Sequence, residues 1–504
     1  MSEQYPALIV ITPLLAALLV SAAGWLRPRL CFPLALAGLG AAAAAATGLL
    51  VQVLATGPVT YRLGGWEPPW GIAYYVDNLN AVVAALVAWV ALFNLVASYR
   101  AVMTDYPEKI GPYYTLYVLA VTGMLGMVVT GDAFNLYVLL EITSLTGYAL
   151  IGLGGGRAPL ASLNYLFLGT IGASFYLLGV GYLYIVTGSL NMADLAKLLT
   201  PLYGSLALLA AFAITLVGLW MKMAFFPLHA WLPNAYGFAP APTASLLAPL
   251  MTKVMVYVMI RIMISVFTVE FVLQEVLVGQ LVVWLAVAAM VAGALFALGQ
   301  RDLKRMLAYI VVAEVGYMVG GAWLGNRLGM TGAVLHLIND AVMTFCVFLA
   351  AGCIYQKTRG TSFEDLRGLF KKMPWTMAAL AAGAMAIIGV PPTGGFFSKW
   401  YLIRGGLEAG HWGFVGALLF SSLINVVLFF RVFEIAFFEP SGGDDSHGGH
   451  GGHEEHGGAV ALAEAPLSML LPLMAAALGL IALGLATGPL VQKLILPIIP
   501  AGLG

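Results

Sequence analysis

Apolar runs of about 20 residues, separated by short polar connections, follow one another along almost the whole chain. An α-helix needs about 20 apolar residues to cross a hydrocarbon core about 30 Å thick. The pattern predicts fourteen membrane spans, at residues 6–26, 30–55, 78–99, 112–130, 132–153, 162–187, 204–226, 243–266, 272–298, 303–323, 330–355, 375–403, 411–436 and 466–490. No basic segment precedes the first run, so we interpret it as a membrane helix and not as a cleaved signal peptide. We expect an all-α polytopic membrane protein.

Two of the predicted spans are interrupted by proline. Span seven breaks at FFPLHAWLP (225–233), and span twelve breaks at GVPPTGGFF (389–397). Proline removes a backbone donor and clashes with the preceding helical turn. Inside a bilayer such a break is tolerated only where protein or a wet cavity satisfies the freed backbone groups. We therefore expect two broken helices beside other polar groups or water.

The broken spans occupy matching places in a faint internal repeat. A glutamate shortly before a Gly-Tyr pair occurs in span five (Glu141) and in span ten (Glu314). Lys222 follows Glu141 by 81 residues, and Lys399 follows Glu314 by 85. Two blocks of five helices face the membrane in opposite directions because five is odd. Matching interruptions in inverted repeats point to an ion site near the bilayer midplane.

This organisation divides the chain into five parts. They are N-terminal helices one to three at 1–110, a first inverted repeat of spans four to eight at 111–266, a second of spans nine to thirteen at 267–437, a His/Gly-rich linker at 438–465 and a C-terminal membrane helix at 466–504.

Composition and charge agree with a membrane protein and narrow its class. Of the residues, 61% are hydrophobic and 9% are charged, whereas about 25% of the residues of a soluble domain are charged. The formal net charge is zero, which gives no indication of a nucleic-acid partner. Cys31, Cys346 and Cys353 form no CxxC pair, so neither a disulfide framework nor a metal cluster is predicted.

The lysines and arginines outside the membrane core predict the orientation. Fourteen of them lie near the connections that follow odd-numbered spans, Lys304 among them, and six lie on the other side, Arg261 among them. Basic residues gather on the cytoplasmic side of membrane proteins. Both termini are therefore predicted to be external, and the linker is predicted to be cytoplasmic.

The linker contains the sequence SGGDDSHGGHGGHEEHGG (441–458), which holds four of the seven histidines. These are His447, His450, His453 and His456. A His-rich tract can bind zinc or nickel, so a metal site is one interpretation. A solvated linker is the favoured one, because its glycines fix no ligand geometry.

Charged or titratable side chains recur inside the predicted spans. They are Glu141, Lys222, Lys253, Glu314, His336, Asp340 and Lys399. A charge at the centre of a membrane helix costs about 2.5–3.5 kcal/mol on insertion scales. Any one of these residues alone could be a structural polar group, but such groups tend to occur as one neutral pair. The set as a whole favours function, with Glu314 and Asp340 the less certain members.

Lysine, glutamate and histidine suit a proton relay, because burial and charged neighbours bring their pKa values toward working pH. We expect Glu141 to pair with Lys222 and to hold it protonated while the pair is closed. Opening the pair would release the proton toward Lys253 through water held at the broken helix. His336 would bridge the halves, since imidazole titrates near neutrality, and Lys399 would be the last site.

Four stretches of the chain resemble a known family. They are FNLYVLLEITSLTGYALIGLG (134–154), KMAFFPLHAWLPNAYGFAPAPTASLLA (222–248), RDLKRMLAYIVVAEVGY (301–317) and GVPPTGGFFSKWYL (389–402). Over roughly residues 75–435 they resemble the antiporter-like subunits of respiratory complex I, of membrane hydrogenases and of Mrp-type Na⁺/H⁺ antiporters. Two further segments, LGTIGASFYLLGVGYLYIVTGSLNMADLA (168–196) and KVMVYVMIR (253–261), are most similar to the D subunit of Mrp antiporters.

The resemblance implies fourteen helices, inverted repeats and a central polar axis. Motif positions of that axis fall on Glu141, Lys222, Lys253, His336 and Lys399. It also implies a multisubunit complex in a prokaryotic inner membrane, with other membrane subunits as partners and without a cofactor of its own.

Span eleven departs from the family pattern. The family usually has His-x-x-x-His followed by a lysine, whereas HLINDAVMT has Asp340 at the second histidine and Thr344 at the lysine. Glu314 stands where an uncharged polar residue or a histidine is commoner. The link between the halves could therefore use a carboxylate.

The leading interpretation is an ion-translocating subunit of an Mrp-type antiporter that exchanges Na⁺ for H⁺. The alternative is a proton-pumping membrane subunit of a redox-driven complex I-like or hydrogenase-like complex. A subunit that itself carries haem is disfavoured, because only His229 and His336 lie in the helical region. An inactive structural family member is the remaining alternative.

Overall fold

The structure, a computed structural model, describes residues 2–275, 278–439, 463–500 and 503. The α-helices of these residues are α1 (Tyr5–Leu26), α2 (Cys31–Thr56), α3 (Asn78–Asp105), α4 (Ile110–Val129), α5 (Ala133–Gly152), α6 (Ala158–Thr187), α7 (Met192–Leu199), α8 (Leu206–Met223), α9 (Leu232–Phe238), α10 (Ala241–Ser265), α11 (Gly279–Leu298), α12 (Leu303–Trp323), α13 (Arg327–Thr358), α14 (Leu369–Lys372), α15 (Pro374–Ile388), α16 (Gly394–Glu408), α17 (Trp412–Phe438), α18 (Leu467–Leu485) and α19 (Thr487–Leu490). Two strands, β1 (Val59–Arg62) and β2 (Ala73–Val76), complete the described elements.

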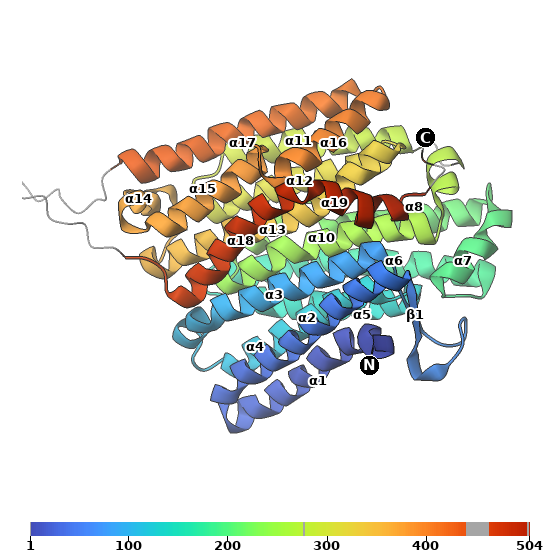
Figure 1. Ribbon diagram of the computed structural model, residues 1–504, viewed down its shortest axis with the longest axis horizontal. Coiled ribbons are helices and arrows are strands. Elements are labelled where there is room, and N and C mark those ends of the chain that lie inside the picture. The colour runs from blue at the N-terminus through green and yellow to red at the C-terminus, as the bar shows by residue number, and fades with distance from the viewer. Residues whose placement is uncertain (1, 276–277, 440–462, 501–502, 504) are drawn as a thin grey trace, which may run out of the picture.

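The long helices lie side by side along the longest axis of the molecule (Figure 1). Thirteen helices of the described residues are long and apolar enough to cross a bilayer. The one predicted span that is missing from these thirteen is span twelve (375–403), which is divided between α15 and α16 by residues 389–393. The protein is thus an all-helical polytopic membrane protein, apart from one short hairpin.

Most predicted spans agree with the helices to within a few residues, and span ten (303–323) coincides with α12. The largest difference concerns span nine, predicted from residue 272, whose helix α11 begins only at Gly279. The segment before it starts with a π turn at Phe271–Glu275. Phe271 is buried against Phe212 and Phe267. Apolar residues at 271–273 therefore reflect aromatic packing and not the first turn of a span.

The apolar pattern did not predict the β-hairpin. Strands β1 and β2 pair antiparallel, with Val59 opposite Val76 and Arg62 opposite Ala73. The hairpin leads directly to Asp77, whose carboxylate accepts from two backbone N–H groups in the first turn of α3. Such an N-cap satisfies donors that a helix leaves unpaired.

Both predicted breaks are present, and each leaves a helix end inside the bundle. Helix α8 ends at Met223, and Ala224 turns the chain with a left-handed φ of 58°. The indole of Trp231 donates to the carbonyl of Met221 at 2.9 Å. Helix α15 ends at Ile388, where Gly389 has a φ of 93° that favours glycine. The second limbs are α9 and α16.

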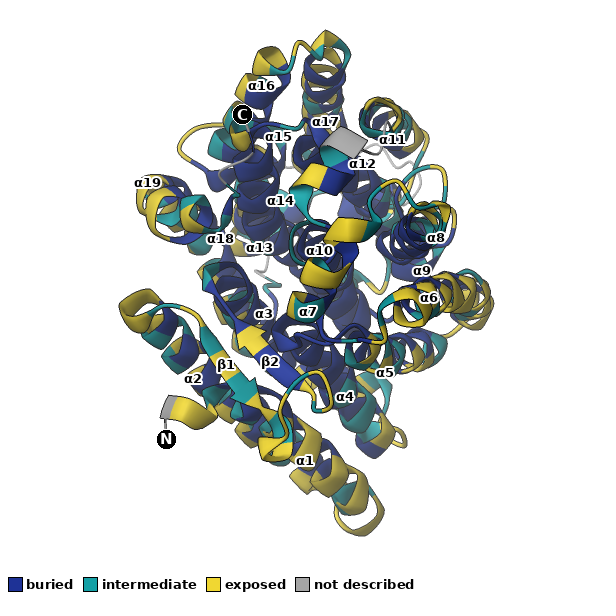
Figure 2. Ribbon diagram, turned by 90° about the vertical axis from the view of Figure 1, so that its right-hand side faces the viewer, coloured by how far each residue is buried: buried dark blue, intermediate teal, exposed yellow. Residues whose placement is uncertain are grey.

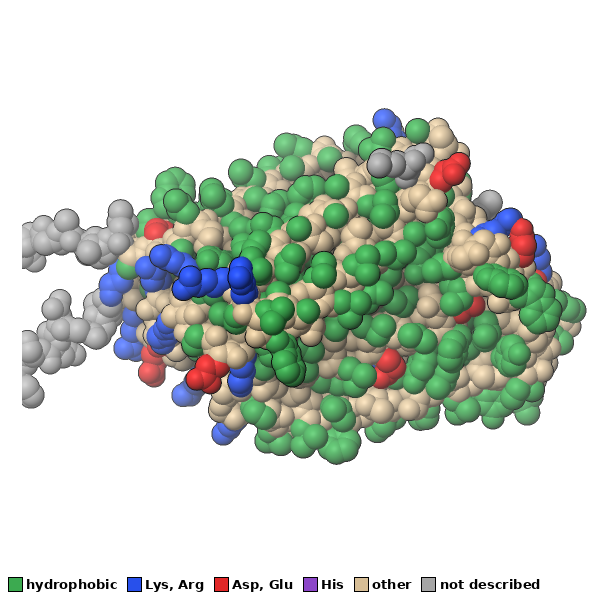
Figure 3. All heavy atoms as spheres, turned by 90° about the horizontal axis from the view of Figure 1, so that it is seen from below, with side chains coloured by type: hydrophobic (Ala, Val, Ile, Leu, Met, Phe, Trp, Pro, Cys, Tyr) green, Lys and Arg blue, Asp and Glu red, His purple; other side chains and the backbone are tan. Residues whose placement is uncertain are grey.

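The two ends of the bundle differ in charge. Lysines and arginines gather at the end from which the grey trace departs, while apolar side chains cover the middle of the surface (Figure 3). We call this the basic end; it contains Arg27, Arg29, Lys109, Lys371 and Lys372. Both chain ends lie at the opposite end, which we call the termini end (Figure 1). Which end faces the cytoplasm stays a prediction from the charge count.

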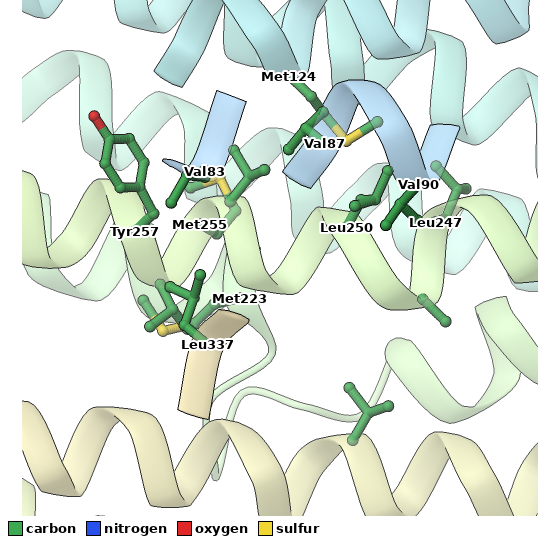
Figure 4. Close-up of a cluster of buried hydrophobic side chains, with 14 of the residues drawn as sticks. Val83, Val87, Val90, Met124, Met223, Leu247, Leu250, Met255, Tyr257 and Leu337 are labelled. Carbon is green, nitrogen blue, oxygen red and sulfur yellow. The ribbon is translucent and has the colours of Figure 1, made fainter. Parts of the chain in front are cut away.

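Buried hydrocarbon packs around α10, at the centre of the molecule (Figure 2). Val83, Val87 and Val90 of α3 and Met124 of α4 lie against Leu247, Leu250 and Met255 of α10 (Figure 4). Of the 25 residues of α10, only the last two are not buried. The polar side chains of α10 are therefore held by protein and not by lipid.

Close contact between α6 and α8 depends on glycine. A Cβ atom at Gly218 of α8 would lie 2.6 Å from the carbonyl oxygen of Gly172 in α6 and 2.7 Å from the backbone nitrogen of Tyr176. Both contacts are with backbone, which cannot rotate away. This approach brings α6 against the turn of α8 that carries Lys222.

We predict that Gly218→Val destabilises the protein by about 1–3 kcal/mol, the usual cost of overpacking. The control is Gly181→Val on α6, where a Cβ would meet nothing within 4 Å. Thermal denaturation of the purified protein in detergent measures both variants. Equal stability of the two would contradict this account of the α6–α8 contact.

Candidate functional site

The structure places the seven predicted side chains on six helices of the bundle. Glu141 lies on α5, Lys222 on α8, Lys253 on α10, Glu314 on α12, His336 and Asp340 on α13, and Lys399 on α16. Seen from the termini end, α10 and α13 occupy the centre, with α5 and α8 on one side and α15 and α16 on the other (Figure 2). Six of the seven are buried, and the side chain of Glu141 is 22% exposed.

Glu141 and Lys222 form the first group. The Lys222 amine lies 3.6 Å from a carboxylate oxygen of Glu141. It donates to the hydroxyl of Ser144 at 2.7 Å and to that of Tyr148 at 3.4 Å. Ser144 and Tyr148 follow Glu141 on α5 by three and seven residues, and these intervals place all three on the same face of the helix. One face of α5 thus supplies a charge and two hydroxyls to one buried amine.

Helix α6 makes room for this group through a second glycine. A Cβ atom at Gly169 would collide with the hydroxyl of Tyr148. The ring of Tyr148 also meets Tyr165 edge to face, and Tyr165 stacks on Trp231 from the break. Aromatic packing therefore connects the position of Tyr148 to the segment between α8 and α9.

Lys253 and Asp340 form the second group. Their charged atoms lie 2.9 Å apart, and both side chains are almost completely buried. The amine also donates to the hydroxyl of Thr344 at 3.1 Å, and that hydroxyl donates to the other oxygen of Asp340 at 2.7 Å. The two residues that depart from the family pattern in span eleven thus both contact Lys253.

Glu314 and His336 form the third group. The carboxylate of Glu314 contacts Nε2 of His336, and Nδ1 of the same ring lies 2.9 Å from the hydroxyl of Ser398. Ser398 belongs to α16, the second limb of the broken span twelve. The imidazole therefore bridges α12 and α16, and either nitrogen can hold the proton.

Lys399 forms the fourth group and lacks a carboxylate partner within 4 Å among the described residues. Its amine donates to the carbonyl of Ile387 at 2.6 Å and to the hydroxyl of Ser422 at 2.9 Å. It also lies 4.9 Å from the centre of the Tyr317 ring. The π face of tyrosine attracts a cation.

Both outer lysines lie at the C-terminal end of a half-helix. Lys222 is in the last turn of α8, and Lys399 reaches back from α16 to the last turn of α15. A helix C-terminus has unpaired carbonyls and a partial negative charge. Each break therefore supplies, inside the bundle, backbone acceptors near a lysine amine.

The four groups are not joined to one another by direct hydrogen bonds among the described residues. Met223 and Leu337 lie beside Met255 of α10, on the side away from α3 and α4 (Figure 4). Proton transfer between groups would consequently require water or side-chain movement. His336 and Asp340 come nearest to a link, since they are one turn apart on α13.

The four linker histidines, His447, His450, His453 and His456, lie outside the described residues. Among the residues that are described, no group of three or more His, Cys, Asp or Glu side chains could hold a metal ion.

The charge pattern of the sequence predicts Arg261 and Lys304 at helix ends, outside the membrane core, whereas the structure buries both side chains. Arg261 lies within α10 and makes two hydrogen bonds of 2.8 Å to the carboxylate of Asp77. Lys304 is buried in the first turn of α12 and donates to the carbonyl of Ala239 at 2.9 Å. Arg261 stands eight residues after Lys253, two helical turns, and this spacing was the available signal for its position inside a span.

Comparison with known proteins places this geometry in a family. Residues 130–425, which carry all seven side chains, match the family described as NADH:quinone oxidoreductase/Mrp antiporter, TM. The chain belongs to this family. The fold is thus that of an antiporter-like membrane subunit.

Two relatives represent the two branches of the family name. The chain is 43% identical to NADH-quinone oxidoreductase subunit N of Desulforudis audaxviator over 98% of both chains. It is 31% identical to the D subunit of the Na⁺/H⁺ antiporter of Alkalihalophilus pseudofirmus over 77% of this chain and 78% of that protein. Identity with the oxidoreductase subunit is higher, contrary to the expectation that the D subunit of Mrp antiporters is the most similar.

Solved structures share the fold along nearly the whole chain. An archaeal membrane-bound sulfane sulfur reductase matches with a TM-score of 0.87 and 30% identity over 97% of this chain and 96% of that chain. The Mrp complex of Dietzia sp. matches with 0.85 and 26% identity over 98% and 96%. Respiratory complex I of Thermus thermophilus matches with 0.74 and 24% identity over 96% and 98%, which shows the fold alone.

We predict that Asp340→Leu destabilises the protein by about 3–5 kcal/mol, because it leaves the Lys253 charge buried without a partner. The double variant Lys253→Met/Asp340→Leu should regain most of that loss, since no buried charge remains. Unfolding in sodium dodecyl sulfate measures the series.

The matched control is the exposed pair Arg367–Glu439, at 2.7 Å. Arg367→Met should cost less than about 1 kcal/mol, as exposed pairs do. A single Asp340 variant as stable as the parent would show that the Lys253 amine does not depend on this carboxylate.

Proposed function

We propose that this chain is a proton-translocating membrane subunit of a redox-driven, complex I-like multisubunit complex. The observation that carries the proposal is the 43% identity, over 98% of both chains, with an NADH-quinone oxidoreductase subunit N. The seven buried titratable side chains supply the chemistry. Electron transfer would take place in partner subunits, and this chain would move protons without a redox centre of its own.

The proposed relay begins at Glu141 and Lys222. While the pair is closed, the carboxylate and two hydroxyls favour the protonated amine. If Glu141 swings away, the amine keeps only neutral partners in a buried site, and desolvation then favours release of its proton. The 22% exposure of the Glu141 side chain gives it room to move.

Lys253 and Asp340 would receive that proton. Neutral Lys253 accepts it on Nζ, and Asp340 stabilises the ammonium that forms. Thr344, hydrogen-bonded to both, would keep the carboxylate oriented toward the amine. A carboxylate thus stands in this relay where the family more often has a second histidine.

His336 and Lys399 would carry the proton onward. Glu314 stabilises the imidazolium form of His336, whose other nitrogen faces Ser398 beside Lys399. Lys399, whose amine donates to a carbonyl and a hydroxyl oxygen, would be the last site and would release the proton from the bundle.

An Mrp-type Na⁺/H⁺ antiporter subunit is the second candidate. One observation favours it, the 31% identity with the D subunit of an antiporter. The same relay would then be driven by a cation gradient.

The driving force separates the two candidates. We predict that the complex purified with this chain, reconstituted in vesicles, acidifies or alkalises the lumen when an electron donor and a quinone or sulfur acceptor are supplied. The signal should persist in Na⁺-free buffer. Proton movement that requires an imposed Na⁺ gradient and ignores the electron donor would instead support the antiporter.

We predict that Glu141→Gln, Lys222→Ala and Lys399→Ala each reduce proton translocation, because each interrupts the relay, and that Lys399→Ala, at its last site, reduces it to the background of empty vesicles. Assembly of the complex should remain intact. Lys197→Ala is the control, since Lys197 is an exposed lysine on α7. Assembled variants that pump at the parental rate would contradict the relay.

A further inference from the structure

The relay as proposed takes every proton through Lys222, but the structure contains polar groups that reach Lys253 from elsewhere. They begin at a small cavity between α3, α10, α13 and α18 near the basic end. Its volume is about 10 Å³, and Ser98, Asp105, Ser245 and Gln356 are among its lining residues. A space of about 10–15 Å³ holds one water molecule.

The mouth of this cavity is charged and partly exposed. Asp105, the last residue of α3, has a side chain that is 21% exposed and pairs with Arg359 at 2.8 Å. Asp105 also lines the cavity, at the basic end of the bundle. A carboxylate at an aqueous mouth can collect protons from solvent.

Ser245 forms the inner wall and belongs to a buried network. Its hydroxyl accepts from the amide of Asn94 at 2.7 Å, and the Asn94 carbonyl accepts from Tyr117 at 3.0 Å. All three residues are buried. Helices α3, α4 and α10 therefore each contribute one polar side chain to a hydrogen-bonded network beside the cavity.

Between Ser245 and Lys253, α10 offers unpaired polar groups. Pro249 has no N–H for the carbonyl of Ser245, four residues earlier. The hydroxyl of Thr252 is buried and has no hydrogen-bond partner among the described residues. Buried polar groups are nearly always satisfied, often by ordered water.

Lys253 itself is turned toward these groups. Its amine donates to the carbonyl of Ala248 at 3.3 Å, one turn nearer to Ser245. Eight residues separate Ser245 from Lys253, about 12 Å along the helix. Ser245 and Thr252 lie on one face of α10, since seven residues make nearly two turns.

In the other direction, toward the termini end, Lys253 meets hydrocarbon. Val83, Met223 and Leu337 lie around Met255 of α10, beside the turn that leads to Tyr257 (Figure 4). The hydroxyl of Tyr257 already donates to the carbonyl of Val128 at 2.8 Å. On α10 itself the polar groups nearest to Lys253 therefore lie toward the basic end, while Asp340 and Thr344 of α13 join its amine to the relay.

We infer that the Ser245 and Thr252 face of α10 holds a short water chain, a second proton-uptake branch that loads Lys253 from the basic end without passing through Lys222 or either broken helix. The inference rests on the proposed function. Protons would pass from the Asp105 mouth over water at Ser245 and Thr252 to the free amine of Lys253, and no other reactant is needed.

The test compares two isosteric substitutions on α10. Thr252→Val removes a hydroxyl of the branch, whereas Thr243→Val removes an equally buried and unpartnered hydroxyl from the opposite face, nine residues away. Protons translocated per electron are measured in vesicles with the whole complex. We expect a partial loss of pumping for Thr252→Val, because the route through Lys222 remains, and no change for Thr243→Val.

Glu141→Gln, measured in parallel, separates this inference from the proposed function. Loss of pumping in Glu141→Gln with full pumping in Thr252→Val overturns the branch and leaves the relay. Full pumping in Glu141→Gln overturns the relay itself. Equal losses in both threonine variants also overturn the branch, because they would reflect burial and not position.

A measurement without substitution guards against a misfolded variant. A high-resolution cryo-EM map of the native complex should show ordered water within hydrogen-bond distance of the Thr252 hydroxyl and of the Ser245 carbonyl. A map of that quality with no water between Ser245 and Lys253 would overturn the inference.

Discussion

The unpaired carbonyls at the ends of two half-helices inside the bundle are the constraint on which the rest of the site depends. A bilayer offers no water to these carbonyls, so protein groups must satisfy them. At the first break the indole of Trp231 donates a hydrogen bond to the carbonyl of Met221, and Lys222 lies in the same turn. At the second break the amine of Lys399 itself donates a hydrogen bond to the carbonyl of Ile387. Each break thus explains why a lysine is tolerated in the middle of a membrane helix.

Once two lysines are fixed in this way, the remaining charges follow from the cost of burial. An isolated buried charge is strongly unfavourable, and removing one partner of a buried pair costs several kcal/mol. Lys253 is matched by Asp340 and His336 by Glu314, all four on α10, α12 and α13 at the centre of the bundle. The chain replaces the cationic series usual at span eleven by alternating signs. A proton added to such a row changes one pair at a time, which suits stepwise transfer.

Much of the fold could be predicted from the sequence, because apolar length and proline leave clear signals. The spans, both breaks and the buried position of the charged residues were accessible in this way, and α12 matched to the residue. Pairing across helices was less accessible. The partner of Lys253 is 87 residues away, and only packing reveals that Asp340, and not a residue of the first repeat, contacts it.

Other features left weak or misleading signals. Arg261 and Lys304 were counted as residues of helix ends, since a basic residue near a polar connection ordinarily faces water. Both are buried, held by Asp77 and by the carbonyl of Ala239. The β-hairpin at 59–76 is too short for a membrane span, and its strands consist largely of the β-branched and aromatic residues that favour strands. The choice between the two branches of the family depended on identity along the whole chain, which local motifs cannot supply.

The central claim is that the buried lysines and His336 change protonation beside their carboxylate partners as the protein works. Infrared difference spectroscopy of the reconstituted complex, recorded before and after an electron donor is added, tests it most directly. The account predicts carboxylate bands that shift on turnover, as the partner amines gain and lose protons, and whose shifts disappear separately in Glu141→Gln and in Asp340→Asn. Spectra of the native complex in which the carboxyl bands stay unchanged during proton movement would contradict it.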